Sequence, residues 1–290
     1  SNLFDDAGFS AKMNQETGNY DLEFVVSLSP DTETFKFFAD FRAAPWTESL
    51  SGYRRFVRPG CSPSYPEGAW SPVYCTWYAV HAAVERSWLE KNAEAAAMLG
   101  IGTFIVDDGW CIDDVERVCP ETITNWYDKI GDWQVSGRKL PFFRQHVEKV
   151  QSLGMKYMLW VSPFMVGVRS RLYAETKCSY LSEEHEGYRV FDPSDEKISS
   201  ASMENLLRLM TDYGIDGLKI DFVDAVPQSL DSPHGRDTFK YMEKLIARMR
   251  SCKSDALIEF RQRYTTPLML DQATQFRAGD VPFDFIENIH

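Results

Sequence analysis

The sequence predicts an α/β fold: a (β/α)8 (TIM) barrel, truncated after its sixth strand and preceded by a short β-rich segment. Short apolar runs typical of buried parallel strands alternate with amphipathic stretches typical of crossover helices. Glycine follows three of those stretches, where helix ends favour a left-handed residue. No glycine-rich phosphate-binding turn follows the first run, which favours a barrel over a doubly wound sheet.

Residues 1–70 form the predicted β-rich segment and a linker. Alternating apolar and polar residues predict strands over Leu22–Leu28 and Thr34–Phe41. Proline and glycine then recur from Pro45 to Gly68, as is typical of a connecting segment. We therefore assign residues 71–290 to the barrel.

Six apolar runs supply the predicted barrel strands. In chain order they are Val73–Val80, Thr103–Asp108, Lys156–Val161, Gly217–Phe222, Ala256–Arg261 and Thr274–Ala278. The helices predicted between them cover Ala82–Leu99, Phe142–Leu153, Ser202–Tyr213 and Arg236–Ser251. Too few residues follow the sixth run for two more strands, so we expect an incomplete barrel, either a fragment of a longer protein or a chain that another part completes.

Composition excludes several classes of partner. A net charge of −12 without a basic stripe disfavours nucleic acid. The apolar runs are far shorter than the roughly 20 residues that cross a membrane. The six cysteines form no Cys-x-x-Cys pair, and we expect no metal and no cofactor. Aromatic rings and carboxylates are abundant, as in sites for neutral sugars, although a tryptophan-rich core explains the rings equally well.

Two charged residues lie in the fourth run. Because side chains alternate along a strand, Lys219 and Asp221 share one face. Catalytic groups of a barrel lie at the carboxyl ends of its strands. A carboxylate held ionised beside a cation suits a nucleophile, and a buried structural ion pair explains the same spacing equally well.

Polar and aromatic residues also lie at the ends of other runs. Asp107 and Asp108 end the second run and belong either to a ligand site or to a solvated loop. Asp280 follows the sixth run, where it would face the fourth as an acid or serve as ordinary turn chemistry. Trp77 and Trp160 lie where a sugar ring would stack, or else in the core.

Three stretches taken together resemble the barrel of family 36 glycoside hydrolases, the bacterial-type α-galactosidases and their raffinose-synthase relatives. They are Gly131–Gln134 with Leu140 and Pro141, then Leu153–Val161, then Tyr213–Phe222. The resemblance extends from about Pro72 to Asp280, and the order of the motifs is more specific than any one of them.

The resemblance implies a role for each candidate residue. Asp221 falls on the family's nucleophile and Asp280 on its general acid/base. Asp107 and Asp108 fall on the aspartates that take galactose O4 and O6. The other implied substrate-binding residues are Trp77, Trp160, Lys219, Arg277, Glu259 and Arg261. Residues 1–70 would be a remnant of the family's N-terminal β-sandwich.

Two segments depart from the family pattern. After the fifth strand the family usually carries a Cys- and Gly-rich loop that contacts the sugar near O2, whereas this chain continues from Glu259 to Tyr264 without it. The residues before Asp280 read Arg-Ala-Gly rather than ending in the commoner serine. The 2-substituent of the sugar is therefore open.

The functional hypothesis is a retaining glycoside hydrolase that cleaves terminal α-linked galactose, or a close relative, from oligosaccharides. Alternatives are a transglycosylase of the same family, a non-catalytic carbohydrate-binding protein, and a magnesium-dependent barrel enzyme. In the last, Asp108, Asp221 and Glu259 would hold the metal and Lys219 would be the base. Expected partners are an oligosaccharide or glycoside substrate and a second copy in a homo-oligomer, with neither nucleic acid nor membrane, and the expected compartment is the cytoplasm.

Overall fold

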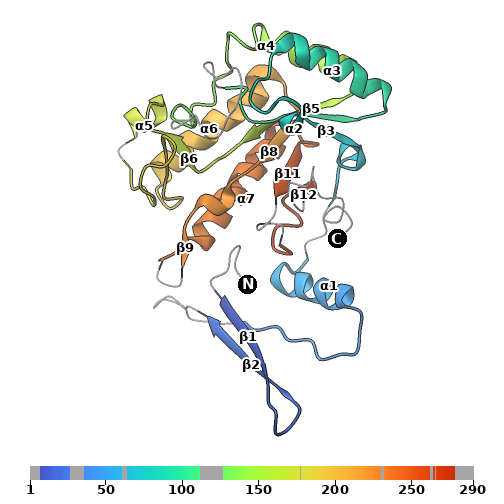
Figure 1. The fold of residues 1–290 in the computed structure, drawn as a ribbon, viewed down its shortest axis with the longest axis vertical. Helices are drawn as coiled ribbons and strands as arrows, with labels where there is room; N and C mark the ends of the chain where they lie inside the picture. Colours follow the sequence, from blue (N-terminus) through green and yellow to red (C-terminus); the bar gives the residue numbers. More distant parts are fainter. Residues whose placement is uncertain are drawn as a thin grey trace.

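A parallel sheet forms the centre of the fold (Figure 1). The computed structural model describes residues 7–26, 36–60, 64–111, 127–176, 178–229, 232–261, 264 and 266–277. The six sheet strands are β3 (Val73–Cys75), β4 (Thr103–Val106), β5 (Lys156–Val161), β8 (Gly217–Ile220), β11 (Leu257–Arg261) and β12 (Gln275–Arg277). They pair in the order β12-β11-β8-β5-β4-β3, and every pairing is parallel. Chain order equals spatial order, so the predicted fold class is confirmed as a curled half-barrel.

Four long helices surround the sheet, as predicted. They are α3 (Arg86–Met98), α4 (Phe143–Ser152), α6 (Glu196–Tyr213) and α7 (Gly235–Cys252). Gly100, Gly154 and Gly214 follow three of them with φ angles of 78°, 86° and 71°, the left-handed conformation that the sequence indicated. Helix α6 begins earlier than predicted because the Asp195 side chain accepts a hydrogen bond from the Lys197 backbone N–H and caps it.

The first predicted strand is only partly a strand. Strand β3 ends at Cys75, and Trp77–Val80 forms the short helix α2. The change follows Thr76, whose hydroxyl accepts the Asp107 backbone N–H at 3.0 Å and whose own N–H reaches the Ile105 carbonyl. The hydroxyl takes the Asp107 N–H in place of the Thr76 carbonyl, and that carbonyl instead accepts the N–H groups of Ala79 and Val80, so the chain turns into α2 at Thr76.

Short elements complete the barrel part. They are the 3-10 helices η1 (Glu67–Trp70) and η2 (Val223–Ala225), helix α5 (Arg171–Glu175), and the antiparallel pairs β6 (Met165–Gly167) with β7 (Tyr188–Val190) and β9 (Gln228–Ser229) with β10 (Ser232–Pro233). Within the described ranges, no helix is long and apolar enough to cross a membrane.

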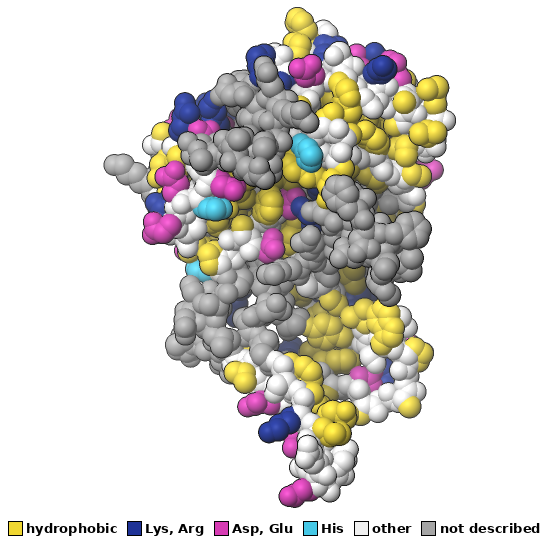
Figure 2. All heavy atoms as spheres, in the orientation of Figure 1, with side chains coloured by type: hydrophobic (Ala, Val, Ile, Leu, Met, Phe, Trp, Pro, Cys, Tyr) yellow, Lys and Arg dark blue, Asp and Glu magenta, His cyan; other side chains and the backbone are white. Residues whose placement is uncertain are grey.

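The leading segment differs from the prediction. Strands β1 (Ala7–Met13) and β2 (Tyr20–Val26) form an antiparallel hairpin, but residues 36–41 are not a strand. Helix α1 (Trp46–Val57) replaces the expected linker. Phe38 packs against Tyr53 and Phe56 of this helix, a spacing of three that places both rings on one face. Hydrophobic side chains gather on the surface around α1 (Figure 2).

An ion-pair network connects α1 to the barrel. Arg58, directly after α1, bonds Glu243 of α7 at 2.8 Å and Asp271 at 2.6 Å. The Tyr65 hydroxyl donates to the Leu270 carbonyl. The domain boundary at residue 70 stays a prediction.

The two faces of the sheet differ in chemistry. The face toward the helices is apolar along its whole length. The inner face begins with an apolar floor made by Ile105, Met158 and Leu257. Gly217 completes this floor, because a Cβ there would lie 1.9 Å from the Leu257 carbonyl oxygen. Above the floor, the inward-facing positions are charged, polar or aromatic.

Candidate active site

The inward-facing side chains above the floor lie in two layers. Strand register aligns Trp160 with Lys219, Lys219 with Glu259, and Glu259 with Gln275. The next inward layer contains Asp221, Arg261 and Arg277, of which the two arginines are register partners. The layers follow from the two-residue alternation of each strand. Seven candidate residues predicted from the sequence thus gather at the carboxyl ends of five strands: Asp107, Trp160, Lys219, Asp221, Glu259, Arg261 and Arg277.

Asp107 and Lys219 form a buried ion pair in the lower layer. The Lys219 Nζ lies 2.5 Å from Asp107 Oδ2, and each side chain is 4% exposed. The Cys75 thiol donates to the same oxygen at 2.9 Å, and the Asp108 backbone N–H donates to Oδ1 at 2.9 Å. Asp107 is therefore held by three donors from β3, β8 and its own turn.

The charges of this cluster shift its protonation equilibria. Burial opposes ionisation of Asp107, but the Lys219 charge and the Cys75 and Lys219 hydrogen bonds outweigh it and lower the Asp107 pKa. Burial likewise opposes the charge on Lys219, yet nearby Asp107 raises the Lys219 pKa. Burial, then the Asp107 charge, raises the Cys75 pKa to about 12, so this thiol stays protonated.

Asp221 lies at the end of β8 and pairs with a different cation from that of Asp107. The Arg261 guanidinium of β11 forms an ion pair with Asp221 Oδ2, and the Trp160 indole N–H donates to the same oxygen at 2.8 Å. Oδ1 accepts the Phe222 backbone N–H at 2.8 Å. We expected Lys219 to be the cation beside Asp221. That expectation is wrong because the Lys219 ammonium reaches across β5 to Asp107 instead.

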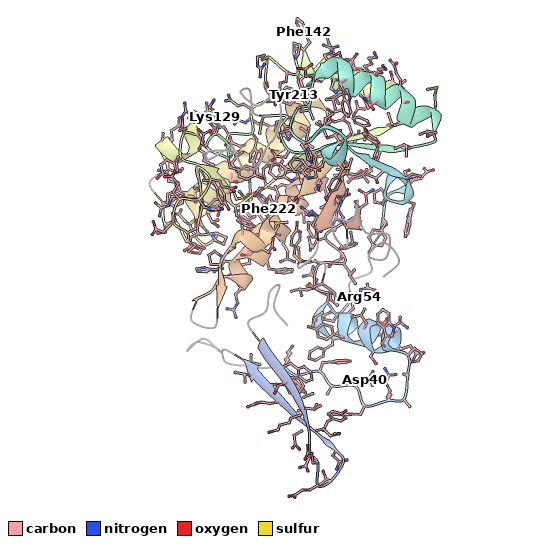
Figure 3. The ribbon with its side chains drawn as sticks, in the orientation of Figure 1. Asp40, Arg54, Lys129, Phe142, Tyr213 and Phe222 are labelled. Atoms are coloured by element: carbon pink, nitrogen blue, oxygen red, sulfur yellow. The ribbon has the colours of Figure 1, made fainter. Side chains whose placement is uncertain are left out.

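Backbone strain directly follows the nucleophile candidate. Phe222, labelled in the middle of the barrel part in Figure 3, has a φ of 50° and a ψ of 33°. A non-glycine residue in this left-handed region costs roughly 1–2 kcal/mol. The turn brings the Phe222 N–H onto the Asp221 side chain, and the Tyr264 hydroxyl bonds the Ile220 carbonyl just before it. The end of β8 is thus fixed on both sides of Asp221.

Asp108 and Glu259 each have a half-buried partner, Tyr127 and Arg277. The Tyr127 hydroxyl bonds Asp108, and burial, then the Asp108 charge, raises the Tyr127 pKa. Glu259 Oε1 accepts Arg277 Nε at 2.8 Å, and that carboxylate raises the Arg277 pKa against the effect of burial. Tyr127 was missed by sequence reasoning because it lies in a loop without strand periodicity.

The two tryptophans occupy different environments. Trp160 is 2% exposed, between Tyr127 at a ring-centroid distance of 6.2 Å and Phe222 at 6.1 Å. Its indole N–H, rather than the face of its ring, is directed at the Asp221 carboxylate. Trp77 is half-buried at the start of α2 and packs edge-on against His81 at 4.9 Å. It lies just past β3 rather than within it.

The general acid/base candidate, Asp280, lies outside the described residues. The magnesium hypothesis finds no support in the described part of the chain, where no three Asp, Glu, His or Cys side chains gather as a metal-binding group. Of its proposed ligands, Asp221 is bonded to Arg261 and Glu259 to Arg277.

Comparison with known proteins identifies the family. The melibiase family model matches residues 52–249. An α-galactosidase of Escherichia coli is 32% identical over 124 residues, which are 42% of this chain and 16% of that protein. The chain therefore spans a small part of the length of such relatives.

Solved structures agree on the fold. The family 36 α-galactosidase AgaB of Geobacillus stearothermophilus superposes with a TM-score of 0.62 at 23% identity, over 80% of this chain and 34% of that one. An α-galactosidase from Thermus thermophilus, in complex with stachyose, gives 0.58 at 20% identity, over 90% of this chain and 49% of that one. Together with the family match over more than half its length, these findings show that the chain belongs to the melibiase family.

Proposed function

We propose that this chain carries the active site of a retaining glycoside hydrolase that releases terminal α-linked galactose, or a closely related sugar, from oligosaccharides. The observation that carries the proposal is Asp221: a carboxyl group fixed by Arg261 and Trp160 at the carboxyl end of β8, on the inner face of the sheet. Membership of the melibiase family and the likeness to α-galactosidases support the sugar.

The proposed reaction is a double displacement. Asp221 attacks the anomeric carbon while Asp280 protonates the leaving oxygen; Asp280 then activates a water molecule that releases the sugar with retained configuration. The two carboxyl groups of a retaining enzyme lie roughly 5–5.5 Å apart. The strand order supports this, because the carboxyl ends of β12 and β8 lie at the same rim on either side of β11.

Asp107 and Asp108 are proposed to recognise the galactose hydroxyls. One lone pair of Asp107 Oδ1 is used by the Asp108 N–H, and a sugar hydroxyl can donate to the other. Glu259, Arg277 and Trp77 are proposed to line the rest of the sugar site. The stachyose complex of the Thermus thermophilus relative supports an oligosaccharide as substrate.

The test is turnover of a panel of aryl α-glycosides (galactose, N-acetylgalactosamine, glucose and arabinose) by the intact protein, with the product anomer followed by NMR. We expect the α-galactoside to react fastest and the α-anomer to appear first. The Asp221→Ala variant should lose on the order of 10⁴-fold in kcat. Asp212→Ala, on the exposed surface of α6, is the matched control and should keep full activity. Initial release of the β-anomer, or preference for the glucoside, would contradict the proposal.

A further inference from the structure

The two oxygens of Asp221 are held differently. Oδ2 accepts from Trp160 Nε1 at 2.8 Å and from the Arg261 guanidinium, which together use both of its lone-pair directions. Within the described part of the chain, the one donor to Oδ1 is the Phe222 backbone N–H at 2.8 Å. Oδ1 therefore keeps a lone pair for bond formation.

Arg261 is built into the site rather than lying at its surface. It ends β11, is 8% exposed, and occupies the same inward layer as Asp221. The Arg261 side chain is 10% exposed and that of Asp221 is 6% exposed, so solvent screens their attraction little. The pair also connects two neighbouring strands, because β8 and β11 are adjacent in the sheet.

We propose that Arg261 is a positioning residue for the nucleophile: together with Trp160 it holds Oδ2 of Asp221, so that Oδ1 forms the bond to the anomeric carbon. This inference rests on the proposed function. It gives Arg261 a different role from the direct sugar contact that the family resemblance implied.

The charge on Asp221 changes in each step of the double displacement. In the first step the Oδ1–C1 bond forms, the C1–O bond to the leaving group breaks, and that electron pair stays on the leaving oxygen, which takes the proton of the general acid. Asp221 loses its negative charge as the ester forms. In the second step a water oxygen bonds to C1, the water proton passes to the general base, and the C1–Oδ1 electron pair returns to Asp221.

Arg261 stabilises the charged carboxylate more than the neutral ester. Without Arg261, the carboxylate becomes a poorer leaving group in the second step. Its higher energy in the free enzyme offsets part of the loss of orientation in the first step. The glycosyl-enzyme should therefore accumulate when Arg261 is replaced, which a purely structural role would not cause.

The experiment uses the intact protein, an aryl α-galactoside, and the variants Arg261→Met and Arg261→Lys. For Arg261→Met we expect kcat to fall on the order of 100-fold with no rise in KM, as for loss of one well-placed charge donor. We also expect a burst of aryl release and a protein mass increased by one galactosyl group. Arg261→Lys keeps the charge without the planar fork and should fall in between. Added guanidinium at non-denaturing concentration should restore part of the Arg261→Met activity.

Arg58→Met is the control, since it removes an arginine ion pair outside the site and should show neither burst nor mass increase. A rise in KM at constant kcat would instead assign Arg261 to sugar binding and overturn the inference. The inference would also be overturned if kcat of Arg261→Met fell by the expected amount but the variant showed no burst, no galactosyl adduct and no rescue by guanidinium. An unmodified protein that turns over no α-galactoside overturns the proposed function and this inference with it, so the two failures are distinguishable.

Discussion

Asp107 and Asp221 are held by the same local pattern in two layers of the site. In each, Oδ1 accepts the backbone N–H of the next residue, and Oδ2 is shared by a cation and a neutral donor. For Asp107 the two are Lys219 and Cys75. For Asp221 they are Arg261 and Trp160.

What differs is the layer and the cation. Asp107 and Lys219 lie directly above the apolar floor, where a compact ammonium fits beside a thiol. Asp221 lies one layer higher, at the mouth, where a planar guanidinium can fix the orientation of the carboxylate. Depth on the inner face therefore distinguishes the two pairs. In the proposed reaction, the lower pair shapes the wall that meets the sugar hydroxyls, and the upper pair orients the group that reacts.

Breaking the lower pair should have the largest effect on stability. Lys219→Met leaves Asp107 buried without its cation, and removing one partner of a buried pair typically costs about 3–5 kcal/mol. We expect a lower free energy of unfolding in urea and, in the folded fraction, a raised KM for the α-galactoside. Arg261→Met should instead lower kcat. Identical kinetic signatures for the two variants would end the distinction between the layers.

The lower pair also predicts how stability depends on pH. The folded-state pKa of Asp107 is depressed, so its contribution is present above the unfolded value of about 3.9 and is lost as pH falls through the folded pKa. The folded-state pKa of Lys219 is raised, so its contribution is full below about 10.4 and is lost as pH rises through the folded pKa.

The measurement is the free energy of unfolding of the unmodified protein and of Asp107→Asn, from urea titrations at a series of pH values. Each unit of pKa displacement corresponds to about 1.4 kcal/mol. The stability advantage of the unmodified protein should shrink at acid pH and stay constant between about pH 5 and 9. A stability advantage that stays constant down to pH 2 would mean that folding does not change the pKa of Asp107.

The layers explain which features the sequence could predict. The apolar runs placed Asp107, Lys219, Asp221 and Glu259 near strand ends, because strands buried on both faces read as short apolar runs. Period-two alternation then put Lys219 and Asp221 on one face. Alternation cannot say which cation meets which carboxylate, since that depends on register between strands distant in the chain. Lys219 lies two residues before Asp221, yet the register with β5 and β4 directs it to Asp107.

The errors at the N-terminal side have a related origin. Trp77 fits the apolar run of a strand, but the tertiary bonds of Thr76 end the strand before it. Helix α1 contains Ser51 and Gly52, which favour a connecting segment locally, while packing of Phe38 on its apolar face favours the helix. In both places tertiary contacts override the conformational preference of the local sequence.

The smallest effect concerns the neutral donor of the lower layer. Cys75→Ala removes the thiol hydrogen bond to Asp107 and should cost about 1 kcal/mol, whereas Cys75→Ser keeps a donor and should cost less. A protonated, mostly buried thiol is also a poor nucleophile. Iodoacetamide at pH 8 should therefore modify the exposed Cys252 of the folded protein and leave Cys75 intact, as read by peptide mass spectrometry. Modification of Cys75 at a rate similar to that of Cys252 would show that the lower layer opens to solvent, and the two layers would then not differ in depth as proposed.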